Sequence, residues 1–157
     1  MSSGTVLVSR VTESDFAELL PLIAKYQEFY ETPSDGAHNF KFFRRFITSD
    51  AEGVLLGARS DTAGPLVGYA CLHWRLDTVG AREVVCLHDL YVDPDRRRTG
   101  IGAAIISAAA DIARSRGAAA LVWTTDPDNT TAQSLYHALG AISSAWIEYE
   151  LPLESPR

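Results

Sequence analysis

An alanine-rich segment, Gly100 to Arg116, is the feature that most constrains the fold of this chain. Ile101, Ile105 and Ile112 recur along it at helical spacing, so the segment predicts a helix with one buried side. An apolar run typical of a strand, Val84 to Val92, stands shortly before it. A strand followed so closely by a helix with one buried side favours a layered α/β fold.

The remaining periodicity predicts one α/β domain covering residues 1–157. Thr12 and Asp15 form a capping box that opens a helix, and Pro21 inside this helix predicts a kink or a break. Two helices are expected before most of the sheet, and the short links between successive strands imply antiparallel neighbours. The expected sheet is mixed and mostly antiparallel, with helices on both faces. The expected strands are 6–11, 54–59, 66–76, 84–92, 120–125 and 146–151, and the other expected helices lie near 40–47 and over 130–139.

The composition excludes several classes of protein. Apolar residues make up 46% of the 157 residues and the net charge is −6, which disfavours a nucleic-acid binder with a basic face. Apolar stretches are too short for a membrane helix, and residues 1–10 lack the pattern of a signal peptide, so a cytoplasmic location is expected. Cys71 and Cys86 lie in apolar runs and are expected to be free core thiols. No metal ligands are assigned.

A basic, glycine-containing turn connects the strand to the alanine-rich helix: Arg97-Arg98-Thr99-Gly100-Ile101-Gly102. Unpaired amides at a helix start and the helix dipole favour an anion, and glycines allow the backbone to approach it closely. A pyrophosphate would fit there, although a solvated basic loop is the simpler interpretation. A Walker loop would need Lys at Ala103, and a dinucleotide fingerprint would need a small residue at Ile105, so both alternatives fit worse.

Two segments resemble the GNAT superfamily of N-acetyltransferases. The strand ending at Val92 and the following turn resemble its acetyl-CoA motif, which reads Arg or Gln, two residues of any type, Gly, one residue of any type, and Gly or Ala. Asn129-x-x-Ala132-x-x-Leu135-Tyr136-x-x-Leu139-Gly140-Ala141 resembles the superfamily's next motif, at the expected distance downstream. Diamine and polyamine acetyltransferases, and their relatives acting on amino acids or histone-like peptides, are the most similar subgroup.

The resemblance implies a reaction and a set of residues. It implies transfer of acetyl from acetyl-CoA to a primary amine of a small molecule such as a polyamine, an amino acid or an aminated antibiotic. Tyr136 matches the position whose phenol protonates the departing sulfur. The implied acetyl-CoA contacts are Leu90, Tyr91 and Val92 through their main chain, together with Arg97, Arg98, Thr99, Gly100, Ile101, Gly102, Ala103, Asn129, Ala132 and Tyr136.

His88 is a candidate general base. An amine of pKa near 10.4 is mostly protonated at neutral pH, and an imidazole of pKa near 6.5 could accept its proton directly or through water. The resembling polyamine enzymes usually carry Glu at this place, and His88 could equally be a core histidine with a satisfied hydrogen bond. Strand alternation predicts that Asp89 points to the opposite face. Candidates to line an acceptor pocket are His88, Tyr26, Tyr30, Trp74, Trp123 and Trp146, although aromatic residues at such spacing are more often core.

Two alternative functions stay open, and so does the oligomeric state. Within the same fold, the acceptor could be a lysine side chain or the N-terminus of a protein. From another class, the chain could be a noncatalytic sensor that holds CoA, although the presence of Tyr136 argues against it. The final strand, Trp146 to Leu151, could supply an edge for a homodimer.

Overall fold

The computed structural model describes residues 4–154, and its internal contacts divide the chain after Thr124 into two compact units. The first holds the sheet and four α-helices, and the second holds one helix and an extended segment.

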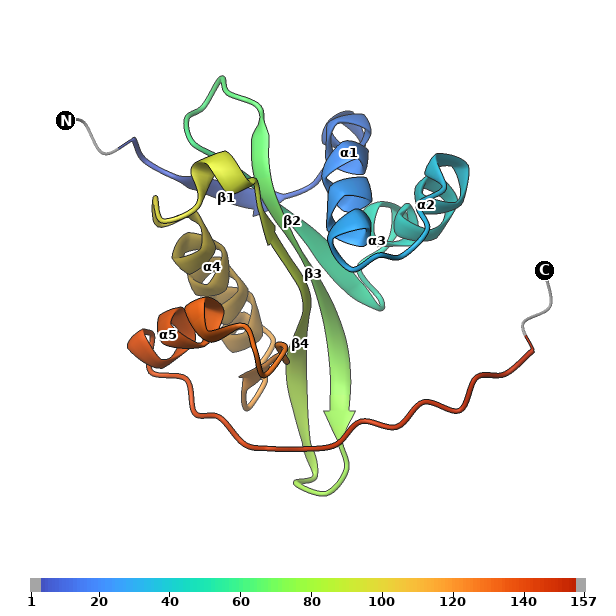
Figure 1. The fold of residues 1–157 in the computed structure, drawn as a ribbon, viewed down its shortest axis with the longest axis vertical. Coiled ribbons are helices and arrows are strands. Elements are labelled where there is room, and N and C mark those ends of the chain that lie inside the picture. The colour runs from blue at the N-terminus through green and yellow to red at the C-terminus, as the bar shows by residue number, and fades with distance from the viewer. Residues whose placement is uncertain (1–3, 155–157) are drawn as a thin grey trace. The chain divides into compact units, whose positions relative to one another are not determined.

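The first unit is built on a five-stranded sheet in the order β1-β2-β3-β4-β5 (Figure 1). Neighbouring strands from β1 to β4 are antiparallel, whereas β5 runs parallel to β4. The predicted mixed, mostly antiparallel sheet is therefore confirmed. The strands are β1 Leu7–Arg10, β2 Gly53–Arg59, β3 Leu66–Asp77, β4 Arg82–Val92 and β5 Leu121–Val122.

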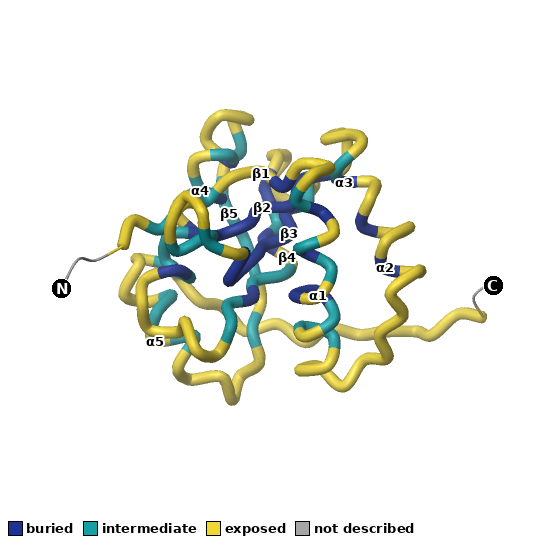
Figure 2. The backbone as a smooth tube through the Cα atoms, turned by 90° about the horizontal axis from the view of Figure 1, so that it is seen from above, coloured by how far each residue is buried: buried dark blue, intermediate teal, exposed yellow. Residues whose placement is uncertain are grey.

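Helices cover both faces of this sheet, with α1 to α3 on one side and α4 on the other (Figures 1 and 2). Apolar residues of α1 such as Phe16 and Leu19 are buried in the same cluster as Tyr69 of β3. On the other face, Ile105 of α4 approaches Gly68, where the sheet surface carries no side chain. The helices are α1 Glu13–Phe29, α2 Gly36–Phe43, α3 Arg45–Thr48 and α4 Ile101–Ser115.

Two expectations about the helical layer are corrected. Helix α1 runs unbroken from Glu13 to Phe29 with Pro21 inside it, because the capping box and the buried side of the helix compensate for one missing amide donor. Three helices rather than two precede β2, since the chain divides at Arg44 into α2 and the single-turn α3.

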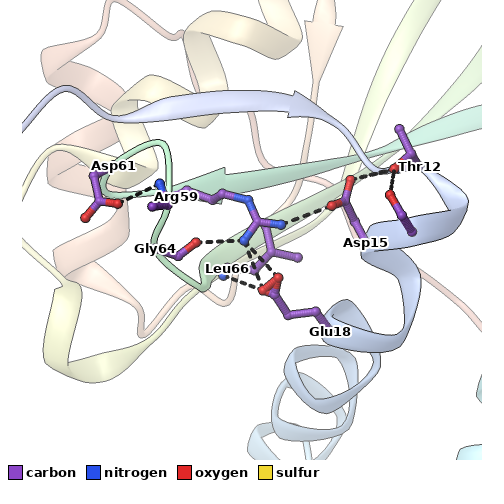
Figure 3. A network of polar contacts seen from close by, with 9 residues as sticks. Thr12, Asp15, Glu18, Arg59, Asp61, Gly64 and Leu66 are labelled. Atoms are coloured by element: carbon purple, nitrogen blue, oxygen red, sulfur yellow. Dashed lines mark hydrogen bonds and ion pairs between the residues drawn. The ribbon is translucent and has the colours of Figure 1, made fainter.

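A polar network ties the start of α1 to the sheet, as Figure 3 shows. The guanidinium of Arg59 on β2 donates to Glu18 Oε1 at 2.8 Å, to Asp15 Oδ1 at 3.1 Å and to the Gly64 carbonyl at 2.8 Å. Asp15 also accepts from the amide and the hydroxyl of Thr12, and these bonds are the main reason that its pKa is lowered. The carboxylate of Asp15 therefore both caps α1 and connects the helix to Arg59 on the sheet.

We expect Arg59→Ala to lower the free energy of unfolding by about 1–3 kcal/mol, because it leaves two partly buried carboxylates without their cation. Chemical denaturation followed by circular dichroism measures the change. Arg114→Ala is the matched control, since the Arg114–Asp111 pair is 75% and 73% exposed and should cost less than about 0.5 kcal/mol. Equal losses in the two variants would contradict the assigned role of Arg59.

The second unit contains α5, Thr130–Ala138, whose start is capped as predicted: Asn129 Oδ1 accepts the amide of Ala132 at 3.2 Å. The predicted final strand over Trp146 to Leu151 is wrong. Within the described residues, 141–154 are extended but pair with no strand. Alternating apolar residues indicate a strand only where a neighbour supplies hydrogen bonds and burial, and here Ile147 and Tyr149 are 79% and 87% exposed.

Candidate active site

The turn between β4 and α4 has the backbone of an anion-binding loop. After a short 3-10 helix over Pro94–Arg96, Arg98 and Gly100 have φ angles of 63° and 86° before α4 begins at Ile101. The turn is braced from within, because the Thr99 hydroxyl donates to the Arg96 carbonyl and Arg97 Nε donates to the Val92 carbonyl at 3.2 Å. Residues 94–100 are exposed, so their amides and side chains face solvent or a ligand.

The start of α4 supplies the positive end of a helix dipole to this turn. The amide of Ala104 donates to the Gly100 carbonyl at 3.0 Å, which is the first bond of the helix. The preceding amides, of Ile101, Gly102 and Ala103, belong to the set that a helix start leaves without intrahelical acceptors. With two arginines at the lip of the turn, the arrangement can bind a phosphate or pyrophosphate.

Strands β4 and β5 diverge next to this turn. Their parallel pairing is limited to Val85 with Leu121 and Cys86 with Val122. Beyond Cys86, β4 continues to Val92 with no further β5 partner among residues 4–154, and this stretch includes Leu90 and Tyr91. Main-chain groups on that side of β4 are therefore available to an extended ligand that leads to the turn.

A bulge in β4 brings His88 and Asp89 together. In the pairing of β3 with β4, Cys71 lies opposite Asp89 and Leu72 lies opposite Leu87, so His88 is an extra residue in its strand. The expectation that Asp89 points away from His88 is therefore wrong: His88 Nδ1 lies 3.0 Å from Asp89 Oδ1. An inserted residue interrupts the alternation of faces on which that expectation depended.

His73 lies beside this pair on β3. Its ring stacks on that of His88 with centroids 5.1 Å apart, and on the ring of Phe46 on its other side at 5.6 Å. Burial lowers the pKa of His73, and the neighbouring His88 lowers it further. Its Nε2 lies 3.4 Å from the Sγ atom of Cys71, a buried free thiol whose pKa is raised by burial. His73 is therefore a neutral neighbour of His88 at physiological pH.

Three tyrosines pack together on the α1 face of the sheet, and two of them, Tyr26 and Tyr69, lie close to the charge of Asp89. Tyr26 lies edge-on to the rings of Tyr69 and Tyr91, with centroids 6.0 Å and 6.2 Å away. Burial raises the pKa of Tyr26 and of Tyr69, and for both phenols the charge of Asp89 is the second cause. The Tyr69 hydroxyl is buried with no hydrogen-bond partner in the described part of the chain. Sequence reasoning missed Tyr69, because its apolar surroundings on β3 are those of a core residue.

A cavity of about 450 Å³ opens between the carboxyl end of α1 and the turn after β4. Its lining has both charges, and Lys25 Nζ lies 3.5 Å from Asp93 Oδ1, which also accepts the Tyr91 hydroxyl at 3.1 Å. Burial raises the pKa of Tyr91 to about 12. A small polar molecule could enter here beside the anion-binding turn. The lining residues are Lys25, Glu28, Phe29, Tyr91, Asp93, Pro94, Asp95 and Arg97.

The remaining predicted site aromatics are not gathered at this place. Tyr30 is 53% exposed and lies edge-on to Tyr26. Trp74 lies toward the other end of β3, where Arg116 stacks over its ring at 3.8 Å and its indole donates to the Asp50 carbonyl. Trp123 is half-buried after β5. In the second unit, Tyr136 is half-buried on α5, one turn after Ala132, and Trp146 is exposed.

A family model described as "Acetyltransferase (GNAT) family" matches residues 19–141. The chain belongs to the GNAT family of acetyltransferases. It is 34% identical over 133 residues to the "Uncharacterized N-acetyltransferase YhfO" of Bacillus subtilis (strain 168), a match that covers 85% of this chain and 87% of that protein. It is 31% identical over 147 residues to the "Thialysine N-epsilon-acetyltransferase" of Bos taurus, covering 87% of this chain and 84% of that protein.

A solved structure supports the same placement. The crystal structure of a probable acetyltransferase aligns with a TM-score of 0.83 at 26% identity, covering 96% of this chain and 99% of that one. This GNAT chain is therefore an acyl-CoA-dependent N-acetyltransferase. No helix within residues 4–154 has the length and apolar character needed to cross a membrane. In the same residues, no group of three or more His, Cys, Asp or Glu side chains is arranged to hold a metal ion.

Proposed function

We propose that this GNAT enzyme transfers acetyl from acetyl-CoA to a primary amine of a small molecule. One observation carries the proposal: the strand that bears His88 and Asp89 leads directly into the anion-binding turn at the start of α4. A donor whose pyrophosphate lies at the turn and whose arm follows β4 would bring its thioester toward this pair. The acceptor amine would then meet a base beside the acyl group.

In this proposal the donor's pyrophosphate is held by the amides of Ile101, Gly102 and Ala103, with Arg97, Arg98, Thr99 and Gly100 shaping the turn. The pantetheine arm bonds the main chain of Leu90, Tyr91 and Val92, where β4 has left β5. Asn129 caps α5, and with Ala132 it orders the start of the helix that carries Tyr136. We assign the phenol of Tyr136 as the acid that protonates the departing sulfur.

His88 is assigned as the base that accepts a proton from the acceptor amine. The imidazole is 64% exposed, so an amine or a relaying water can reach it. After the proton leaves, the nitrogen lone pair attacks the thioester carbonyl, and the C–N bond forms in a tetrahedral intermediate whose nitrogen still carries two hydrogens. The C–S bond then breaks as the sulfur takes its proton from Tyr136. The second nitrogen proton passes through water to the tyrosinate, which gives the amide, the free thiol of CoA and a neutral Tyr136, with the first proton on His88.

The acceptor would enter through the cavity beside α1. Phe29 and Tyr91 offer aromatic surface there, while Glu28, Asp93 and Asp95 supply negative charge for a cationic amine. The cavity is open to solvent, and its volume leaves room for a small amine beside the anion-binding turn. Thialysine, the substrate named for the Bos taurus relative, is a small molecule of this kind. We leave Trp74 out of the acceptor site because it lies at the other end of β3.

The test is release of free thiol from acetyl-CoA with a panel of thialysine, other amino acids, diamines, aminoglycosides and lysine peptides. We expect turnover on a small amine with kcat/KM at least tenfold above that on any peptide. Preference for a peptide would instead support a protein acetyltransferase. Binding of CoA by calorimetry, with no thiol release on any amine, would support the sensor interpretation.

We also propose that the enzyme is a homodimer in which the extended segment 141–154 is covered. Ile142, Trp146, Ile147, Tyr149 and Leu151 are all at least 79% exposed, and apolar surface of this extent usually marks a contact. Sedimentation equilibrium is expected to give twice the chain mass of 17.1 kDa, and Ile147→Lys with Tyr149→Lys should shift the enzyme toward monomer. A wild-type monomer at micromolar concentration would contradict the proposal.

A further inference from the structure

We propose that Asp89 and His88 act as a dyad, in which Asp89 is the positioning residue that fixes the tautomer of His88 and stabilises its protonated form. This inference rests on the proposed function, since it concerns the base that prepares the acceptor amine. It assigns a role to Asp89, which regular strand alternation would place on the face opposite to His88.

The bulge is what makes the dyad possible. In a regular strand, side chains of consecutive residues point to opposite faces, and His88 and Asp89 would be unable to share a hydrogen bond. Because His88 is inserted between the pairs Leu72–Leu87 and Cys71–Asp89, its side chain joins that of Asp89 and stacks on His73. Bulges of this kind often re-aim a side chain next to an active site.

The geometry also fixes which nitrogen carries the proton. An ionised carboxylate only accepts hydrogen bonds, so the 3.0 Å contact requires a proton on His88 Nδ1. The basic lone pair is then on Nε2, the nitrogen directed away from Asp89. When Nε2 takes a proton from the acceptor ammonium, the imidazolium that forms lies against the negative charge of Asp89.

Asp89 is more deeply buried than His88. Its side chain is 16% exposed, against 64% for His88, and it lies among Tyr26, Tyr69 and Cys71, whose ionised forms its charge disfavours. The other ionisable groups facing the pair within the first unit are His73, itself influenced by Glu52, and Cys86, whose thiol is half-buried. Asp89 places a negative charge within hydrogen-bond distance of the His88 ring.

The decisive experiment measures Asp89→Asn in two backgrounds. In the wild type we expect kcat to fall by roughly 10–100-fold while KM for the amine changes less than about threefold, because the amide keeps the shape and loses the charge. The acid limb of kcat/KM should move to lower pH by about one unit, since the imidazolium loses its neighbouring carboxylate. In the His88→Glu background, which keeps a base without a ring, Asp89→Asn should cost less than about threefold.

Two outcomes would overturn the dyad. An equal loss from Asp89→Asn in both backgrounds would mean that Asp89 acts independently of His88, and a rise in KM for the amine with unchanged kcat would mean that it binds the acceptor. If Asp89→Asn does not fold, a second measurement on the wild-type enzyme tests the dyad. Nitrogen-15 NMR without substrate reports the tautomer of each histidine, and the spectrum of His88→Gln identifies the signals of His88. We expect protonated Nδ1 and bare Nε2 for His88. The opposite tautomer would refute the dyad, whether or not the enzyme acetylates an amine. Failure to acetylate any amine tested would refute the proposed function, and it is measured separately from the tautomer.

Discussion

Tyr136→Phe should reduce thiol release at saturating acetyl-CoA and amine by roughly 10²–10³-fold, the range expected for loss of a general acid. A thiol of pKa about 8.5 departs more easily when it leaves protonated, and Phe cannot supply that proton. Because the ring itself is kept, packing around α5 should be unchanged. KM for acetyl-CoA is therefore expected to stay within about threefold, as measured by initial rates over a range of donor concentrations.

Tyr149→Phe is the matched control for this variant. Tyr149 lies in the same unit and has no assigned part in the reaction, and Phe keeps the ring that the proposed dimer contact uses, so removal of the Tyr149 hydroxyl should change kcat by less than about twofold. A Tyr136→Phe enzyme with wild-type kcat would remove Tyr136 from the mechanism and leave protonation of the sulfur to solvent. A large rise in KM for acetyl-CoA with unchanged kcat would instead assign the hydroxyl to donor binding.

Gly100→Val should raise KM for acetyl-CoA by roughly 10–100-fold and leave kcat at saturating donor within a few-fold. Gly100 has φ of 86° and nothing within 4 Å of an added Cβ, so any effect comes from the backbone rather than from a clash. A β-branched residue disfavours this conformation by about 1–2 kcal/mol or more, and the turn would relax away from the shape that presents its amides. Initial rates and calorimetric CoA binding measure the change.

Two controls distinguish a general effect of backbone strain from a specific effect on the anion-binding turn. Asn tolerates left-handed backbone better than Val, so Gly100→Asn should raise KM much less. Gly117 has a similar φ of 72° and an equally open surrounding at the opposite end of α4, so Gly117→Val tests the same strain away from the turn. If Gly117→Val raised KM as much as Gly100→Val, the effect would be one of stability and the turn would lose its assignment.

Much of the fold could be predicted because local patterns agree with long-range packing. The three central strands and the helix after the turn were expected within a few residues of where they lie, since each has one strongly apolar face or is buried on both. The errors came where a pattern depends on a partner. Residues 146–151 alternate like a strand, but alternation does not create the neighbour that a strand requires. A break at Pro21 was one of the two expected outcomes for α1, the other being a kink, and the helix continues through Pro21 because packing outweighs one lost hydrogen bond.

The part of the candidate site that is formed by main-chain groups of a sequence motif could be predicted, whereas the part that depends on strand pairing could not. The turn over Arg97 to Gly102 could be predicted because its glycines, its arginines and the helix that follows are all visible in the local sequence. The pairing of His88 with Asp89 was not readable, because a bulge is visible only in the register of the facing strand. The influence of the Asp89 charge on the Tyr69 phenol depends in the same way on how β3 lies beside β4.

Because His88 is an extra residue in the pairing of β3 with β4, the sheet does not need this residue, whereas the proposed reaction does. Deleting codon 88 in frame would leave Leu87 opposite Leu72 and Asp89 opposite Cys71, so the ladder would run on without interruption. Three nucleotides thus separate a chain that carries the proposed base from one in which the pairing of β3 with β4 is continuous. A relative without this codon would keep the pairing of the two strands and lose the proposed proton acceptor.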